Sequence, residues 1–176
     1  VEFRTGVIGR DGDIDIEPPG APMTGHRQSP FFDKGMFTAK LAEMGATNDL
    51  AIRTLAALED QFTMADLDGA LADLAGRVPS SNAVHHVTQV MQWLASSNYE
   101  LTFPQESELS QRVLFPAGPT ESRGMEDARF VRFVATDESV IYYAPYTAYD
   151  GFTILPQLIE TTDFRTFRIA TLNGPS

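Results

Sequence analysis

The sequence predicts a mainly β protein with antiparallel strands, interrupted by a helical insertion over residues 31–96. Apolar and polar residues alternate through much of residues 128–172 between short turn signals, which is the two-residue period of half-buried strands. Residues 31–96 are rich in alanine and leucine instead, and their apolar residues recur at the spacing of a helical face. Strands across residues 50–75 would contradict this prediction.

Composition and charge narrow the class of protein. Of its 176 residues, 43% are hydrophobic and 21% are charged, which is ordinary for a globular chain. The formal net charge of −11 argues against nucleic acid or an anionic membrane as a partner, because both are bound by clustered Lys and Arg. No apolar run approaches the length that spans a bilayer.

Cysteine and histidine give no sign of a metal centre. The absence of cysteine excludes disulfides and thiolate metal sites, and it fits a reducing, cytoplasmic location. His85 and His86 are neighbours, so on a helix they point about 100° apart and do not chelate one ion together. We therefore expect neither a metal site nor an organic cofactor.

Residues 1–30 are predicted to contain two strands and a loop. Strands at residues 1–8 and 13–17 should be joined by a turn, for which Asp11-Gly12 is the signal. Residues 18–30, which are rich in proline, are predicted to be a loop. The chain begins with the alternation of a strand interior and ends near Asn173-Gly174, a hairpin signal that lacks a following strand. We expect a piece that is incomplete at both ends.

Three or four short helices are predicted in the insertion. The second should follow a cap signal at Asn48, and the third should open with a capping box of Thr63 and Asp66 and end at Gly76. Helices this short depend on tertiary packing. The four apolar stripes contain, in chain order, Phe37, Leu41 and Met44; Leu50, Leu55, Leu58 and Phe62; Leu67, Ala70, Leu71 and Leu74; and Val84, Val87, Met91 and Leu94.

Residues 97–176 return to the strand pattern. A strand at 128–135 should pair with one at 139–146, and further strands should follow at 151–161 and 166–172. Antiparallel strands can be joined by such short turns. The expected result is a four-stranded antiparallel sheet.

A charged motif precedes this sheet. Glu126 and Asp127 stand between Arg123 and Arg129, directly after Gly124 and Met125. On an extended backbone Glu126 and Asp127 point to opposite sides, whereas Asp127 and Arg129 share a face. A carboxylate beside a guanidinium suits a site for hydroxyl groups or an anion. A surface ion pair at the start of a strand would give the same pattern.

Three stretches together resemble glycoside hydrolase family 130, which contains β-mannoside phosphorylases and β-mannosidases. They are residues 121–133, with Gly124-Met125-Glu126-Asp127-Ala128-Arg129; Tyr146-Thr147-Ala148-Tyr149-Asp150-Gly151; and Thr162-Asp163-Phe164 with Phe167. The family carries a Gly-x-Glu-Asp-Pro-Arg motif and a Tyr-Thr-Ala-Tyr-Asp-Gly-like motif on adjacent strands of a five-bladed β-propeller. Here Ala128 stands in place of the proline.

The resemblance covers residues 97–172 and, more weakly, 1–20. It implies that the chain is part of a five-bladed β-propeller, with residues 1–30 as propeller strands and loop. Residues 31–96 would be an insertion, and residues 97–176 would form a blade that carries the active-site motifs. Family 130 members cleave β-mannosides with inversion, and the phosphorylases among them use inorganic phosphate as co-substrate.

The resemblance also implies roles for six residues. Asp127 would be the general acid, and it must then stay protonated through burial and a neighbouring carboxylate such as Asp150. Glu126 is the residue that we expect to anchor the turn by accepting backbone N–H bonds. Contacts with the sugar or the phosphate would come from Arg123, Arg129, Tyr149, Asp150 and Glu126.

Other functions fit the same residues. An inverting β-mannosidase would use water, activated by a second carboxylate, whereas a phosphorylase would need Lys and Arg facing Asp127. A non-catalytic carbohydrate-binding propeller would need neither. The insertion could be simple core, an assembly contact or a lid, with Trp93 and Tyr99 as sugar-stacking platforms.

The expected partners are a β-mannoside oligosaccharide and another polypeptide. Exposed blade edges should pair with a second copy or with the remainder of the same protein, because unpaired strand edges invite association.

Overall fold

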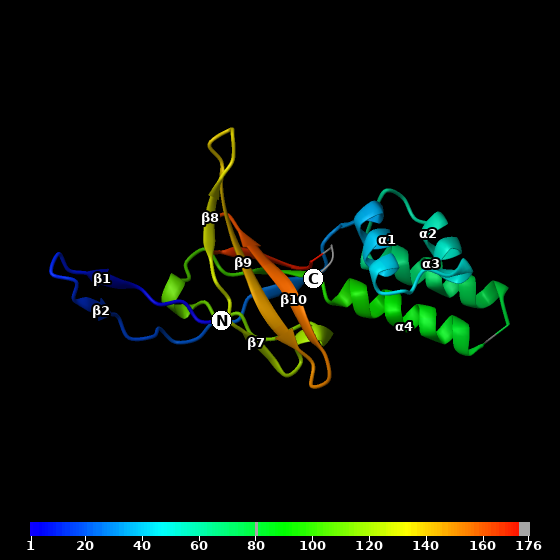
Figure 1. Ribbon diagram of the computed structural model, residues 1–176, viewed down its shortest axis with the longest axis horizontal. Helices are drawn as coiled ribbons and strands as arrows, with labels where there is room; N and C mark the ends of the chain where they lie inside the picture. The colour runs from blue at the N-terminus through cyan, green and yellow to red at the C-terminus, as the bar shows by residue number, and fades with distance from the viewer. Residues whose placement is uncertain (80, 173–176) are drawn as a thin grey trace. The chain divides into compact units, whose positions relative to one another are not determined.

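Figure 1 presents the computed structural model, which describes residues 1–79 and 81–172. The chain divides into two compact units. Val1–Gln28 and Tyr99–Ala170 form the sheet unit, and Ser29–Asn98 with residues 171–172 form the helical unit. The protein is mainly β, with antiparallel strand pairs and a few helices, as predicted. The hairpin signal at Asn173-Gly174 lies outside the described residues.

One sheet dominates the sheet unit, with the order β3-β6-β11-β10-β9-β7 and with β8 also paired to β9 (Figure 1). Residues of the third and fourth predicted strands form β10 and β11, which follow β9 in the sheet. The bounds are β3 His26–Gln28, β6 Tyr99–Thr102, β7 Gly124–Glu126, β8 Val131–Val134, β9 Val140–Tyr149, β10 Ile154–Thr161 and β11 Thr166–Thr171.

Strand β9 pairs with three other strands of this sheet. Along one edge it pairs with β10, from Tyr142 opposite Thr161 to Tyr149 opposite Ile154. Along its other edge it pairs first with β8, with Val131 opposite Tyr143, and then with β7. The expected hairpin is confirmed, but its first strand begins at Val131 rather than at residue 128. The chain leaves the strand conformation at Asp127, whose φ is 56°.

The sheet extends further than the predicted four strands. Strand β11 pairs with β6, and β6 pairs with β3, where His26 lies opposite Thr102. Residues 26–28 were expected to be loop, and that expectation is wrong. The three residues of β3 are all exposed, so no apolar alternation marks them. Their conformation comes from pairing with a strand more than seventy positions away in the chain.

A separate hairpin lies near the N-terminus. Within the part of the chain that the structure describes, strands β1 (Gly6–Ile8) and β2 (Ile14–Ile16) pair only with each other. The turn between them is closed by a hydrogen bond from the Gly9 N–H to the Asp13 carbonyl (2.8 Å). Gly12 has a φ of 91°, which favours glycine over residues with a Cβ. The predicted Asp-Gly turn is therefore confirmed.

A buried carboxylate connects strands of this sheet through hydrogen bonds. The Glu121 side chain is fully buried and accepts hydrogen bonds from the backbone N–H groups of Ala117 and Gly118 (both 2.8 Å). It also accepts from the hydroxyl of Tyr99, in β6, and from that of Tyr146, in β9 (2.7 Å). The Tyr146 hydroxyl lies 2.5 Å from Oε1 of the buried Gln157, in β10, so the network reaches three strands.

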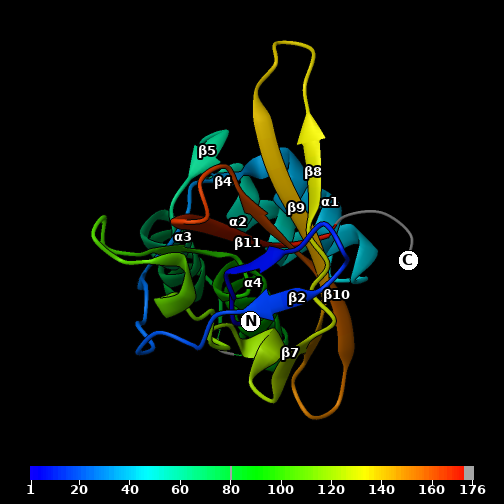
Figure 2. The same ribbon diagram turned by 90° about the vertical axis from the view of Figure 1, so that its left-hand side faces the viewer.

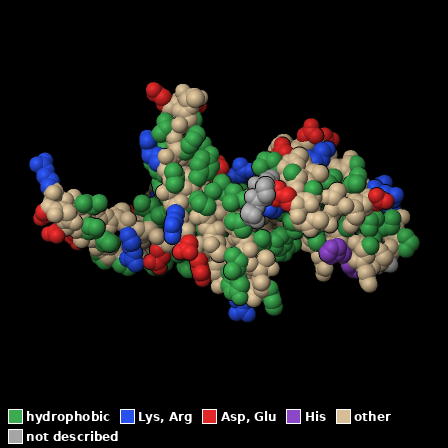
Figure 3. Space-filling view, viewed as in Figure 1, with side chains coloured by type: hydrophobic (Ala, Val, Ile, Leu, Met, Phe, Trp, Pro, Cys, Tyr) green, Lys and Arg blue, Asp and Glu red, His purple; other side chains and the backbone are tan. Residues whose placement is uncertain are grey.

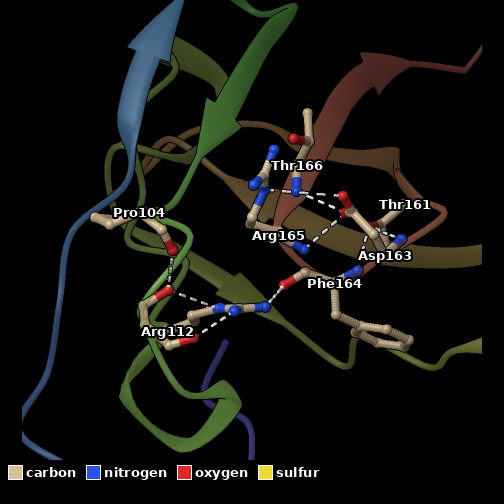
Figure 4. Close-up of polar contacts among 8 residues, drawn as sticks. Pro104, Arg112, Thr161, Asp163, Phe164, Arg165 and Thr166 are labelled. Atoms are coloured by element: carbon tan, nitrogen blue, oxygen red, sulfur yellow. Dashed lines mark hydrogen bonds and ion pairs between the residues drawn. The ribbon is translucent and has the colours of Figure 1, made fainter.

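The turn between β10 and β11 is held from two sides (Figure 4). Asp163 accepts hydrogen bonds from the N–H groups of Arg165 and Thr166 (both 2.8 Å). Burial alone would raise the pKa of Asp163, but these backbone bonds outweigh it and hold the pKa below its usual value. From the other side, Arg112 donates to the Phe164 carbonyl (2.8 Å). The predicted Asp163 turn is thus built from backbone contacts.

The helical unit contains four helices around one apolar core, with the core drawn from the predicted stripes. Their first N–H groups are capped by Asp33, Asn48, Thr63 and Ser81, and the Thr63–Asp66 capping box is present as predicted. Within the described residues, every helix is too short or too polar to cross a bilayer. The helices are α1 Lys34–Glu43, α2 Asp49–Ala56, α3 Met64–Arg77 and α4 Asn82–Ser96.

Several predicted details of the helical unit are wrong. Helix α2 ends at Ala56, before Phe62. Phe62 lies in a two-residue strand, β5 (Gln61–Phe62), which pairs with β4 (Phe32–Asp33). Phe62 is still buried, because it contacts two other phenylalanine rings. Helix α3 passes through Gly76 to Arg77. Apolar spacing predicted which side chains are buried better than it predicted where each helix stops.

The two aromatic residues considered as sugar platforms lie in the cores. Tyr99 is buried under the sheet, with its hydroxyl bonded to Glu121. Trp93 is partly buried against the helical core. The platform interpretation is therefore wrong for Tyr99, whose ring is buried.

Replacing the buried carboxylate should destabilise the sheet unit. Glu121→Ala leaves two buried hydroxyls and two N–H groups without their acceptor, so we expect a loss of about 3–5 kcal/mol in the free energy of unfolding. Urea denaturation followed by circular dichroism measures it. Glu106→Ala, at an exposed position, is the matched control and should stay within about 0.5 kcal/mol of the native value. Equal losses in the two variants would contradict this assignment.

The same network predicts a loss of stability at alkaline pH. Burial, followed by the charge of Glu121, raises the pKa of both Tyr99 and Tyr146. Their hydroxyls therefore stay protonated in the folded chain after the unfolded chain has begun to ionise. Stability should fall above about pH 10, by up to about 1.4 kcal/mol per pH unit for each tyrosine.

Urea denaturation between pH 8 and pH 11 tests this loss. Tyr146→Phe should remove one tyrosine's share of the slope, although the variant is less stable at neutral pH. An unchanged slope would show that Tyr146 does not link folding to alkaline pH.

Candidate functional site

Strand pairing brings the two sequence motifs together. Strand β7 carries the start of the first motif and pairs with the end of β9, so that Gly124 lies opposite Tyr149 and Glu126 lies opposite Thr147. The N–H of Arg123 donates to the carbonyl of Tyr149 (2.9 Å). Residues that are about twenty-five positions apart in the sequence are therefore neighbours at one corner of the sheet.

A pocket of about 340 Å³ lies at this corner. The Tyr149 side chain is at its edge, with its hydroxyl donating to the carbonyl of Gly151 (2.9 Å). The ring of Phe152 is almost completely exposed. Aromatic faces beside a guanidinium provide both an apolar platform and hydrogen-bond donors for a polar ligand. The lining residues are Arg123, Tyr149, Asp150, Gly151 and Phe152.

The turn after β9 shapes the pocket. Gly151 has a φ of 102°, a conformation that strains any residue with a Cβ. A Cβ at this position would also lie 3.3 Å from Cγ of Arg123. Glycine therefore lets the turn pass close to the arginine stem.

Asp150 holds this turn rather than facing the pocket as a free carboxylate. Its Oδ1 accepts hydrogen bonds from the N–H groups of Thr153 (2.7 Å) and Phe152 (2.8 Å). The Thr153 bond, followed by the Phe152 bond, lowers the pKa of Asp150. Asp150 is therefore ionised at neutral pH, and one of its oxygens is occupied by the backbone.

Asp127 lies on the surface, just after the end of β7. Its side chain is exposed, so the expected burial is wrong. Its φ of 56° takes it out of the strand conformation, and the alternation that placed Asp127 and Arg129 on one face does not apply. Within residues 1–79 and 81–172, no ion pair joins these two side chains. A left-handed conformation at a non-glycine residue costs about 1–2 kcal/mol.

The remaining predicted residues divide between the pocket and the surface. Arg123 lines the pocket with Tyr149 and Asp150, whereas Glu126, Asp127 and Arg129 do not line it. Glu126 and Arg129 are exposed. No cluster of three or more His, Asp or Glu side chains able to hold a metal ion is found in the part of the chain that the structure describes.

Sequence reasoning assigned the anchoring carboxylate to the wrong residue. Glu126 was expected to accept backbone N–H bonds, and no such bond to it occurs among the described residues. Glu121 makes them instead, to Ala117 and Gly118. The sequence contains one signal for Glu121. This residue stands two positions after the Gly118-Pro119 turn, and the N–H groups at the start of such a turn need an acceptor.

Two substitutions should separate the charge of Asp150 from its role in the turn. Asp150→Asn keeps an oxygen that can accept the two N–H bonds, whereas Asp150→Ala loses it. Because these bonds lower the pKa of Asp150, their contribution to stability is present above about pH 4 and declines as the pH falls through the lower pKa of the folded chain.

We therefore expect Asp150→Ala to unfold at a lower temperature than Asp150→Asn at pH 7, with a smaller difference between Asp150→Ala and the native chain at pH 2.5. Thermal unfolding by circular dichroism measures both. Equal melting temperatures for the two variants at pH 7 would exclude the turn role.

Comparison with known proteins gives no significant match to any family model, curated protein or solved structure.

Proposed function

We propose that this chain contributes the sugar-binding corner and the general acid of an enzyme that cleaves β-mannosides with inversion, using inorganic phosphate as the nucleophile. Its sheet would then be part of a five-bladed β-propeller. The observation that carries the proposal is the pairing of β7 with β9, which brings Arg123, Tyr149 and Asp150 into one pocket. The resemblance to glycoside hydrolase family 130 implies two motifs on adjacent strands. The pairing of β7, which carries the start of the first motif, with β9 supports it.

The chemistry requires a proton donor and a nucleophile on opposite sides of the glycosidic bond. Asp127 would supply the proton to the leaving oxygen, directly or through a sugar hydroxyl, as the C–O bond breaks. A phosphate oxygen would form the new bond to the anomeric carbon, which yields a sugar phosphate and a free sugar. Arg123 and Arg129 are the cations at hand for the sugar or the phosphate.

The backbone at Asp127 supports a functional role for this residue. Only three non-glycine residues in the described chain have a positive φ, namely Asp127, Glu138 and Phe164. Strained residues of this kind often occur at functional sites, where the strain positions a side chain. The strain at Asp127 falls within the motif that assigned the acid.

Exposure of the site favours a second candidate, a carbohydrate-binding module without catalysis. Asp127 is exposed, so the burial expected of a general acid is absent. Tyr149, Phe152 and Arg123 would bind a sugar without any acid. An inverting hydrolase, with water activated by a second carboxylate in place of phosphate, is the remaining alternative.

The test is an assay on β-1,4-mannobiose with and without phosphate, using the native protein and Asp127→Asn. Asparagine tolerates the left-handed conformation, so the variant should fold normally. Its turnover should fall by about 10²–10⁴-fold, the usual size of a general-acid effect, with little change in sugar affinity. Glu138→Gln is the control, because Glu138 is also an exposed acid with a positive φ, outside the motif.

The outcomes distinguish the candidates. Sugar phosphate formed only in the presence of phosphate supports the phosphorylase, and free mannose without phosphate supports the hydrolase. Native turnover in Asp127→Asn would remove Asp127 from the chemistry. Sugar binding by calorimetry without any turnover would support the binding module, and no binding at all would contradict every version of this proposal.

A further inference from the structure

Two hairpins of the sheet unit have free strand edges. Among residues 1–79 and 81–172, strands β1 and β2 pair only with each other, and β8 pairs only with β9. Figure 1 shows both hairpins extending away from the rest of the sheet unit, and Figure 2 shows the same for the β8–β9 hairpin. A two-stranded hairpin is marginally stable by itself, and its free edge is a template for another strand.

The β1–β2 hairpin has an apolar face and an opposite face with an aspartate. The register places Ile8 opposite Ile14, so these two and Ile16 share a face, and all three are more than 60% exposed. Asp15 lies on the opposite face, next to the exposed Val7 across the hairpin, and Asp13 directly precedes the strand. Neither aspartate forms an ion pair within the described residues 1–79 and 81–172. Figure 3 shows hydrophobic and acidic side chains together on this hairpin.

The free edge of β8 has the complementary pattern. Val131 and Phe133 share a face and are 62% and 52% exposed, and the ring of Phe133 contacts that of Tyr143. Arg132 lies on the opposite face, is exposed, and has no ion pair among the described residues. Figure 3 shows hydrophobic side chains along this hairpin too.

The backbone groups of this edge are also free to pair. The N–H groups of Arg129 and Ala135 point to β9, where they donate to Pro145 and Ser139. Alternation along the strand then directs the N–H and C=O of Arg132 and Val134 away from β9, toward the open edge.

We propose that β2 of one copy of this chain pairs edge to edge with β8 of a second copy, so that the two hairpins form one intermolecular four-stranded sheet. In this arrangement the isoleucines of β2 continue the apolar face of Val131 and Phe133. On the other face, Asp15 lies beside Arg132. Packing the two hairpins face to face would join the apolar faces but leave these charges apart, so edge pairing is the arrangement that satisfies both.

The partner of each edge is a second copy of this chain, because every copy carries both the β2 edge and the β8 edge. Within one copy the two edges are unpaired although they belong to the same unit. A two-fold dimer closes with two identical contacts, the β2 of each copy on the β8 of the other. Cross-strand pairs of opposite charge stabilise such a sheet, and like charges destabilise it.

Charge reversal tests this pairing. Sedimentation velocity at several concentrations should show a dimer for the native chain, and Asp15→Arg or Arg132→Asp should each raise the dimer dissociation constant about tenfold or more, because both contacts of the dimer are changed. Mixing the two variants should restore dimers, since one contact of the mixed dimer joins the two reversed charges and the other joins the two native ones. Circular dichroism checks that each variant is folded.

A backbone variant provides an independent readout. Val134→Pro removes an N–H group from the open edge of β8, whereas the hydrogen bonds to β9 come from the residues on either side of Val134. Val134→Pro should therefore weaken the dimer. Val134→Thr keeps the N–H group and should not weaken it. A native chain that is monomeric at about 200 µM, or a dimer that all of these variants leave unchanged, would overturn the proposal. Failure of the mixture to recover dimers would also overturn it, whatever the enzymatic assay shows.

Discussion

The sheet unit depends on a single buried carboxylate. Glu121 is surrounded by four hydrogen-bond donors, the hydroxyls of Tyr99 and Tyr146 and the N–H groups of Ala117 and Gly118. Three of these donors reach Oε1 and the Tyr146 hydroxyl reaches Oε2, so both carboxylate oxygens have partners. Burying a charge is costly without such partners, and removing the charge would leave them unsatisfied. The sheet and the segment before β7 are therefore held in one arrangement.

This arrangement also positions the candidate site. Arg123 follows Glu121 by two residues, and Tyr149 follows Tyr146 by three. The network fixes one end of each short segment, and the hydrogen bond from the Arg123 N–H to the Tyr149 carbonyl fixes the other. Two side chains from different parts of the sequence thereby line one pocket with little freedom to move apart. A site built on a strand end in this way can be precise although it is exposed.

The sheet unit contrasts a hydrogen-bonded interior network with free strand edges. Glu121, Gln157 and Thr120 are joined in this buried network, whereas the hairpins β1–β2 and β8–β9 expose both apolar side chains and backbone groups. Natural sheets usually protect such edges with charge, proline or a covering segment. Here β2 has aspartates beside its free edge and β8 has an arginine. Such opposite charges favour pairing between the two edges.

The sequence by itself determined the features that depend on neighbours along the chain. Helix caps at Asn48 and Thr63, the Asp11-Gly12 turn and the β8–β9 hairpin are set by interactions that span a few residues, and so the local pattern predicted them. Periodicity also identified the apolar residues that fill the helical core. In each case the same short segment contains both the signal and the structure.

Only the tertiary structure decided the features that join distant segments. Strand β3, with no apolar alternation, exists because β6 pairs with it, and Phe62 is buried in a strand because Phe32 lies opposite. For the site, the sequence identified Arg123, Tyr149 and Asp150, but neither the exposure of Asp127 nor the role of Glu121. A glutamate in the sequence does not show whether its carboxylate will face water or four hydrogen-bond donors. What distinguishes Glu121 from Glu126 is the set of groups that folding brings around each carboxylate, and those groups come from elsewhere in the chain.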